Sequence, residues 1–121
     1  METERILLRY WEESDAEVLF KYASDPDVGP RAGWPEHKSV EESREIIQTY
    51  FHNETTWAIV LKETGEAIGC IGYYTHETSN IPIGENDSEV GYWVGKPYWN
   101  KGICTEALKL MLDYCIQVKH F

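Results

Sequence analysis

The sequence predicts an α+β domain, in which helices pack on a largely antiparallel sheet in the order β-α-α-β-β-β-α. Residues 14–51 place apolar side chains at helical spacing, after a short apolar run near the N-terminus. From residue 55 to residue 95 the apolar pattern repeats every second residue, which indicates strands. Helical spacing then returns in the last part of the chain, from residue 105. The chain is therefore expected to form one domain over residues 1–121.

The composition supports a folded protein of the cytoplasm. Apolar residues make up 42% of the 121 residues and aromatic residues 13%, so disorder is not expected. No run approaches the roughly 18–20 apolar residues of a membrane span, and the N-terminus "METERILLRY" is charged where a signal peptide is apolar. We therefore expect no membrane partner and a cytoplasmic location.

Charge and cysteine content narrow the function classes. The 21 acidic and 11 basic residues give a net charge of −10, which argues against nucleic acid as a partner and is compatible with an amine-bearing substrate. The three cysteines form no C-x-x-C pair, so reduced thiols are expected. The histidines at positions 52, 76 and 120 lack metal-ligand spacing, so no metal is expected.

The first half of the chain predicts a strand and two helices. Arg5–Trp11 reads as the strand, and Ser14 with Glu17 has the spacing of a capping box at the start of the first helix. Residues 26–39 hold the prolines and glycines of a loop. A second capping box, Ser39 with Glu42, starts the second helix, whose inward positions are predicted to be Ile46, Ile47 and Tyr50.

The second half predicts a three-stranded meander followed by a helix. Thr55–Lys62 and Ala67–Thr75 form a hairpin around the turn "ETGE", and Asp87–Gly95 follows a polar connection as the third strand. The final helix is expected to begin at Thr105. Its apolar stripe comprises Ala107, Leu108, Met111, Leu112 and Cys115.

The turn between the third meander strand and the final helix, "YWNKGICTEA", is the candidate binding site. A helix N-terminus presents unpaired N–H groups and the positive end of the helix dipole, and both favour an anion. Gly102 permits unusual backbone angles, Lys101 adds a cation, and the Thr105 hydroxyl could cap the helix or donate to a phosphate. A plain tight turn with a capped helix is the alternative. The spacing is neither that of a P-loop nor G-x-G-x-x-G.

The stretch "SEVGYWVGKPYWNKGICTEALKLMLDY" resembles the acyl-CoA-binding motif of the GNAT superfamily of N-acetyltransferases. More narrowly, it is similar to the branch of ribosomal-protein-alanine (N-terminal) acetyltransferases. The N-terminal "ERILLRYWEESDAEVLFKYASDPDV" and the hairpin "ETGEAIGCIGYY" fit the same family, so the resemblance covers nearly the whole chain. It implies a GNAT-like fold with acetyl-CoA as co-substrate.

The resemblance also assigns residues to roles. It implies that the strand edge pairs with the pantetheine arm and that the turn holds the diphosphate; the implied cofactor-binding residues are Tyr92, Trp93, Val94, Trp99, Asn100, Lys101, Gly102, Ile103, Cys104 and Thr105. Trp99 stands where the superfamily has Gln or Arg, as is usual for this branch. Cys104 replaces a small Gly or Ala, so its sulfur either crowds the diphosphate or is tolerated there.

The family reaction is direct attack of an amine on the thioester of acetyl-CoA. Glu89 matches the acidic position at the head of the family strand and is the candidate general base, with a solvent-facing carboxylate as the alternative. Trp34 and His37 lie in a loop that resembles the border of the acceptor site, with loop packing as the alternative. Cys104 sits at a helix N-terminus, where its thiol pKa could be lowered, but direct transfer gives it no catalytic role.

Proteins of this family continue further, through a C-terminal β-α-β-β portion that supplies one wall of the cofactor cleft. Its absence after Phe121 predicts an incomplete GNAT-like domain, in which the strand that contains Glu89 to Val94 has an open edge. We expect a truncated product, or a homodimer or strand-exchanged oligomer that covers the edge. A non-catalytic CoA-binding remnant or a self-associating fragment is therefore the alternative to an enzyme.

Overall fold

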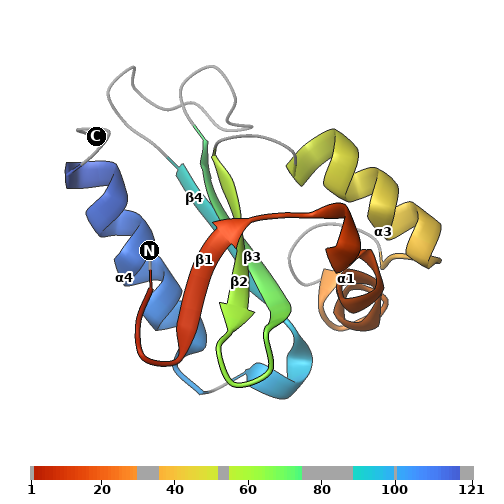
Figure 1. The fold of residues 1–121 in the computed structure, drawn as a ribbon, viewed down its shortest axis with the longest axis horizontal. Helices are drawn as coiled ribbons and strands as arrows, with labels where there is room; N and C mark the ends of the chain where they lie inside the picture. The colour runs from red at the N-terminus through yellow and green to blue at the C-terminus, as the bar shows by residue number, and fades with distance from the viewer. Residues whose placement is uncertain (1, 30–35, 52–54, 75–88, 100, 118–121) are drawn as a thin grey trace.

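The protein is described from a computed structural model, which covers residues 2–29, 36–51, 55–74, 89–99 and 101–117. A four-stranded antiparallel sheet with the order β1-β2-β3-β4 lies at the centre (Figure 1). Helix α4 covers one face of the sheet, and α1 and α3 cover the other face. The predicted fold class and the order β-α-α-β-β-β-α are confirmed.

The strands follow the predicted segments closely. They are β1 (Ile6–Tyr10), β2 (Thr56–Leu61), β3 (Glu66–Tyr74) and β4 (Glu89–Val94). Alternate side chains of β2 enter opposite cores: Trp57 and Ile59 face α4, whereas Ala58 and Val60 face α1. A β-bulge opposite Ile59 and Val60 adds one residue to β3.

Helix α1 (Ala16–Ala23) begins in a way that differs from the prediction. A 3₁₀ turn, Glu13–Asp15, precedes it, and the Asp15 carboxylate accepts a hydrogen bond from the Glu12 N–H at 2.9 Å. The predicted Ser14–Glu17 capping box is therefore wrong. Asp15 is held in place because the Arg9 guanidinium donates two hydrogen bonds to it, both 2.8 Å long.

Helix α3 (Val40–Ile46) begins as predicted, because the Ser39 hydroxyl accepts a hydrogen bond from the Glu42 N–H at 3.1 Å. The helix then widens into a π-helical turn, Ile47–Phe51. Ile47 is buried as expected, but Tyr50 is 66% exposed, so its predicted inward orientation is wrong. The wider turn explains the error, because it changes the angular position of every residue that follows.

Helix α4 (Ile103–Gln117) begins two residues before the predicted start. Its buried stripe repeats every four residues, and comprises Ile103, Ala107, Met111 and Cys115. Two predicted members differ: Leu108 is only partly buried, and Leu112 is 44% exposed. The stripe fixes α4 on the sheet so that its N-terminus lies close to the C-terminal end of β4 (Figure 1).

Candidate functional site

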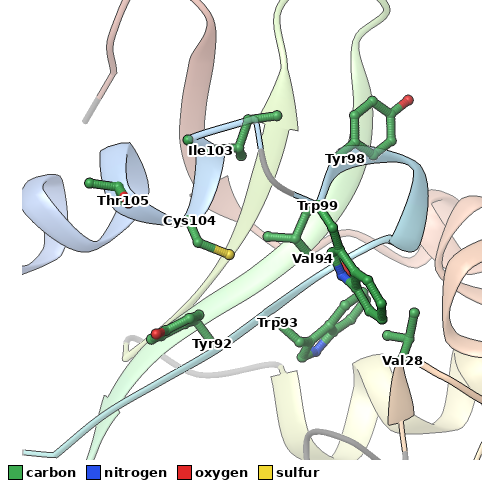
Figure 2. A pocket seen from close by; sticks show the side chains of 10 residues that line it. Val28, Tyr92, Trp93, Val94, Tyr98, Trp99, Ile103, Cys104 and Thr105 are labelled. Atoms are coloured by element: carbon green, nitrogen blue, oxygen red, sulfur yellow. The ribbon is translucent and has the colours of Figure 1, made fainter.

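A pocket opens where the end of β4 meets the first turn of α4. Its volume is about 490 Å³, and it is lined by Val28, Tyr92, Trp93, Val94, Tyr98, Trp99, Gly102, Ile103, Cys104 and Thr105. Figure 2 shows the Trp93 and Trp99 indoles near Val28, and the Cys104 side chain directed from α4 toward the β4 ribbon. The structure therefore brings eight of the ten residues predicted to bind the cofactor to one cavity.

The turn that leads from β4 to α4 is held by several hydrogen bonds. A short 3₁₀ helix, Lys96–Tyr98, follows the strand and is closed by a bond from the Tyr98 N–H to the Gly95 carbonyl, 2.9 Å long. The Trp99 indole N–H donates to the Val94 carbonyl at 2.9 Å. This bond holds the turn against the end of β4, and both residues that it joins line the pocket.

Helix α4 points its N-terminus into this pocket. Its first α-helical hydrogen bond joins the Glu106 N–H to the Gly102 carbonyl at 3.1 Å. The N–H groups of Ile103, Cys104 and Thr105 precede that bond and so have no acceptor within the helix. Thr105 is the third residue of α4, so the interpretation of its hydroxyl as the helix cap is wrong; a hydroxyl in the first turn of the helix remains available to a ligand.

Gly102 has a φ of +77°, in the left-handed region that glycine adopts more readily than other residues. The observed conformation gives a physical reason for the glycine in this turn. Lys101, next to it, is exposed and lies over the Tyr98 ring, with its Nζ 5.9 Å from the ring centroid. It is absent from the pocket lining, so its predicted role would require the side chain to swing toward a ligand.

The free edge of β4 forms the second part of the site. Within the part of the chain that the structure describes, β4 pairs only with β3. The Gly95 N–H donates to the Ile68 carbonyl of β3 at 2.7 Å. Because backbone groups alternate in direction along an extended strand, Trp93 also pairs with β3, and the N–H and C=O groups of Tyr92 and Val94 point to the free edge.

Cys104 lines the pocket with a thiol that burial makes less acidic. It is partly buried, and this burial raises the pKa of the thiol above its ordinary value. The lowered pKa expected from its place at a helix N-terminus is therefore wrong, since desolvation by burial shifts the pKa upward. Cys104 is thus a neutral thiol that gives part of the pocket a polarizable, weakly polar surface.

His37 lies away from the pocket. It is 6% exposed, and its Nδ1 lies 2.7 Å from the hydroxyl of the fully buried Ser43 in α3. Burial lowers the pKa of His37 below its usual range. These observations favour packing of the loop against α3 over a direct contact of His37 with substrate.

Three predicted site residues lie wholly or partly outside the described part of the chain. Trp34 and Asn100 lie outside the described residues, and for Glu89 only the backbone is described, as the first residue of β4 opposite Tyr74. Val28 and Tyr98 line the pocket but were not predicted. Tyr98 belongs to the turn already singled out, whereas Val28 comes from the loop after α1 and carries no chemical signal in the sequence.

No group of three His, Cys, Asp or Glu side chains that could hold a metal ion occurs among the residues that the structure describes. Over the same residues, none of the helices is long and apolar enough to cross a membrane. The three cysteines Cys70, Cys104 and Cys115 are free thiols.

Comparison with known proteins yields a family and a set of relatives. The model of the acetyltransferase (GNAT) domain matches residues 5–120. An uncharacterized N-acetyltransferase named p20, from Bacillus licheniformis, is 33% identical over 117 residues, which are 93% of this chain and 63% of that protein. A second, YoaA from Bacillus subtilis, is 28% identical and is covered over 64% of its length. The chain thus spans somewhat less than two thirds of the length of these relatives.

Solved structures agree on the fold. A GNAT-family acetyltransferase from Bacillus anthracis superposes with a TM-score of 0.74 at 24% identity, over 97% of this chain and 66% of that chain. A ribosomal-protein-S5-alanine acetyltransferase from Vibrio fischeri superposes with a TM-score of 0.65 at 23% identity, over 98% of this chain and 68% of that chain. The fold, the family model and the pocket at the head of α4 agree: the chain belongs to the GNAT acetyltransferase family.

Proposed function

We propose that the pocket between β4 and α4 binds acetyl-CoA and that the protein transfers its acetyl group to an amine. The observation that carries the proposal is the meeting of two kinds of backbone donor in one cavity: the unpaired amides at the start of α4 and the free edge of β4. The first suits a diphosphate, and the second suits an arm that contains amides. Acetyl-CoA has both.

The diphosphate would lie against the first turn of α4. The N–H groups of Ile103, Cys104 and Thr105 can donate to its oxygens, and the helix dipole adds about half a positive charge. Gly102 lets the backbone approach closely, and Lys101 lies near enough to the turn to add a charge from solvent. Asn100, which tolerates left-handed backbone angles, would complete this loop.

The pantetheine arm would run along β4 as an additional strand. The N–H and C=O groups of Tyr92 and the N–H of Val94 are directed to the side on which such an arm would lie. The Trp93 and Trp99 indoles provide an apolar wall beside it. The thioester would then reach the N-terminal part of β4, beyond Tyr92.

Acetyl transfer requires an oxyanion donor and a proton acceptor. A backbone N–H of the β4 edge would stabilise the developing charge on the thioester oxygen, which is worth about 3 kcal/mol in other enzymes. Glu89, at the head of the same strand, would accept the proton of the attacking amine, directly or through water. The sulfur of CoA leaves with the electron pair of the broken C–S bond and is then protonated.

The acceptor would be an amine that is positively charged in solution. The net charge of −10 favours the approach of such a group. The similarity to the ribosomal-protein-S5-alanine acetyltransferase of Vibrio fischeri suggests a protein N-terminus as one acceptor class. Free thiols and the absence of a membrane-spanning helix among the described residues are compatible with action in the cytoplasm.

A second proposal is a chain that binds CoA without turnover, or that associates with itself through the β4 edge. The specific observation in its favour is the exposure of three large apolar side chains: Tyr92 of β4 is 48% exposed, and Leu112 and Ile116 of α4 are 44% and 60% exposed. A homodimer or strand-exchanged oligomer would cover both the edge and these side chains.

Calorimetric titration with acetyl-CoA, followed by a thiol-release assay over a panel of amines, separates the two proposals. Binding with turnover supports the acetyltransferase, and binding without turnover supports the CoA-binding module. Absence of both, together with a mass well above that of one chain on a sizing column, supports self-association and refutes the acetyl-CoA site.

A further inference from the structure

An arginine at the N-terminal end of the chain holds the turn in front of α4. Arg5 lies immediately before β1, and its Nη1 donates a hydrogen bond of 2.8 Å to the Lys101 carbonyl. Its Nη2 makes an ion pair with the Glu106 carboxylate, in the first turn of α4. One guanidinium therefore joins the turn before the helix to the helix itself, across 96 residues of sequence.

A second residue of the N-terminal segment supports this ion pair. The Thr3 hydroxyl donates to the other oxygen of the Glu106 carboxylate at 2.7 Å. The same hydroxyl oxygen accepts the N–H groups of Arg5 and Ile6, each at 3.2 Å, so the segment before β1 is folded around it. Both carboxylate oxygens of Glu106 are thus occupied, and the Arg5 side chain is held against the turn.

The bond to Lys101 fixes the direction of a peptide group that matters for an anion. A carbonyl oxygen directed into the pocket would repel a phosphate, and the Lys101 carbonyl is instead directed to the guanidinium. The next residue, Gly102, has positive φ, and a Cβ placed on it would lie 3.4 Å from Arg5 Nη2. Arg5 therefore packs directly against the backbone whose following amides face the pocket.

The ion pair with Glu106 has a second consequence, which concerns charge. A carboxylate in the first turn of α4 is favourable for the helix dipole but repels a diphosphate bound at the same N-terminus. The guanidinium of Arg5 neutralises this carboxylate at close range. Without Arg5, a bound diphosphate would face both an unpaired carboxylate and a turn that is free to rotate its Lys101 carbonyl inward.

We propose that Arg5 is a positioning residue for the diphosphate-binding turn, which it sets through the Lys101 carbonyl and the Glu106 carboxylate. This inference rests on the proposed acetyl-CoA site. It assigns to the N-terminal segment, which lines no part of the pocket, a part in cofactor affinity. Arg5 touches neither the acetyl group nor the acceptor, so its effect is expected on cofactor binding and not on the chemical step.

The test compares Arg5→Gln with Arg9→Gln in the full 121-residue chain. Arg9 is a matched control, because it lies in β1, close to Arg5 in the chain, and makes a two-bond ion pair, but to Asp15 near α1. Affinity is measured for acetyl-CoA and for pantetheine, which lacks the diphosphate. Arg5→Gln is expected to weaken acetyl-CoA binding about tenfold, as for a lost hydrogen bond to a charged group, and to leave pantetheine affinity unchanged.

Two further variants separate geometry from charge. Arg5→Lys keeps the charge but not the planar fork, so it is expected to recover only part of the affinity. The double variant Arg5→Gln with Glu106→Gln removes the carboxylate left without its arginine. It is expected to recover the part of the acetyl-CoA affinity that was lost to charge repulsion. Arg9→Gln is expected to lower stability without changing acetyl-CoA affinity. Unchanged acetyl-CoA affinity in folded Arg5→Gln, or an equal loss for pantetheine, overturns the proposal.

Amide hydrogen exchange at Glu106, whose N–H is bonded to the Gly102 carbonyl, gives a readout that does not depend on a ligand. Arg5→Gln should accelerate exchange there, and Arg9→Gln should not. If the unmodified chain fails to bind acetyl-CoA, the proposed function fails, while faster exchange in Arg5→Gln still supports the positioning of the turn and unchanged exchange overturns it. Should Arg5→Gln not fold, Arg5→Lys is judged by the same two readouts.

Discussion

Replacing Gly102 with valine perturbs the turn at its most restricted point. The φ of +77° places this residue in the left-handed region, where a side chain with a Cβ costs roughly 1–2 kcal/mol and a β-branched one is a clear outlier. The valine variant can relieve this strain if residue 102 leaves the left-handed region. The amides of Ile103 to Thr105 would then lose their alignment with the free edge of β4.

The strain sets the expected size of the effect. If acetyl-CoA binds only to the observed conformation of the turn, about 1–2 kcal/mol is subtracted from its binding energy, which corresponds to a roughly 5- to 30-fold weaker affinity. Calorimetric titration of the purified variant measures this change. The unfolding transition in urea, recorded on the same sample, shows whether the variant is folded.

Gly65 provides a matched control within the same chain. It has a φ of +74° in the β2–β3 turn, and no atom lies within 4 Å of the position that a Cβ would take. Gly65→Val is expected to reduce stability by a similar amount and to leave acetyl-CoA affinity unchanged. The reasoning is refuted if folded Gly102→Val binds acetyl-CoA within about twofold of the unmodified chain.

Three further predictions concern the core, pH and the pocket thiol. Met111→Ala, at a fully buried position, should lower the free energy of unfolding in urea titrations by about 2–5 kcal/mol. Leu112→Ala, at a position that is 44% exposed, should lower it by much less. Equal losses in the two variants would contradict the assignment of the buried stripe. The pKa of His37 is lowered in the fold, so the unfolded chain binds a proton at a higher pH than the folded chain does. The contribution of neutral His37 to stability is therefore present above pH 6.5 and is lost as the pH falls toward the folded pKa. In thermal unfolding, His37→Gln should lose less stability than the unmodified chain between pH 7 and pH 5. Burial raises the pKa of Cys70 to about 12, whereas Cys104 is partly buried in the pocket wall. Iodoacetamide at pH 8 should therefore label Cys104 before Cys70, and bound acetyl-CoA should slow the labelling of Cys104. A labelling rate of Cys104 that acetyl-CoA does not change would argue against the site.

Local sequence patterns were sufficient to predict most of the fold. The change of period at residue 55 and the return of helical spacing before the C-terminus predicted the strands and helices to within two residues at the ends that can be compared. Tyr50 was placed wrongly because the π-helical turn changes the spacing of the last residues of the second helix. The β-bulge in β3 likewise alters which residues face α4 and has no clear signal in a single sequence.

The candidate site was predictable where its residues are adjacent in the chain. Trp99 and residues 102–105 form one segment, and resemblance to a family identified this segment together with the edge of β4. Val28 and Arg5 reach the site or its supporting turn from distant segments, and only tertiary packing reveals such placements. The pKa of Cys104 was misjudged for a related reason, since burial is a property of the fold and not of the helix start.

The hydrogen bond from the Trp99 indole to the Val94 carbonyl limits how anything can add to the sheet. Along the outer side of β4 this acceptor is already partly used, whereas the N–H of Val94 and both backbone groups of Tyr92 stay directed to the free side. An incoming segment, whether a cofactor arm or another polypeptide, is thereby offered a stronger acceptor at Tyr92 than at Val94, which favours alignments that pair with Tyr92. Substituting phenylalanine for Trp99 would release that acceptor and should permit alternative alignments, with precipitation of the purified chain as the visible sign.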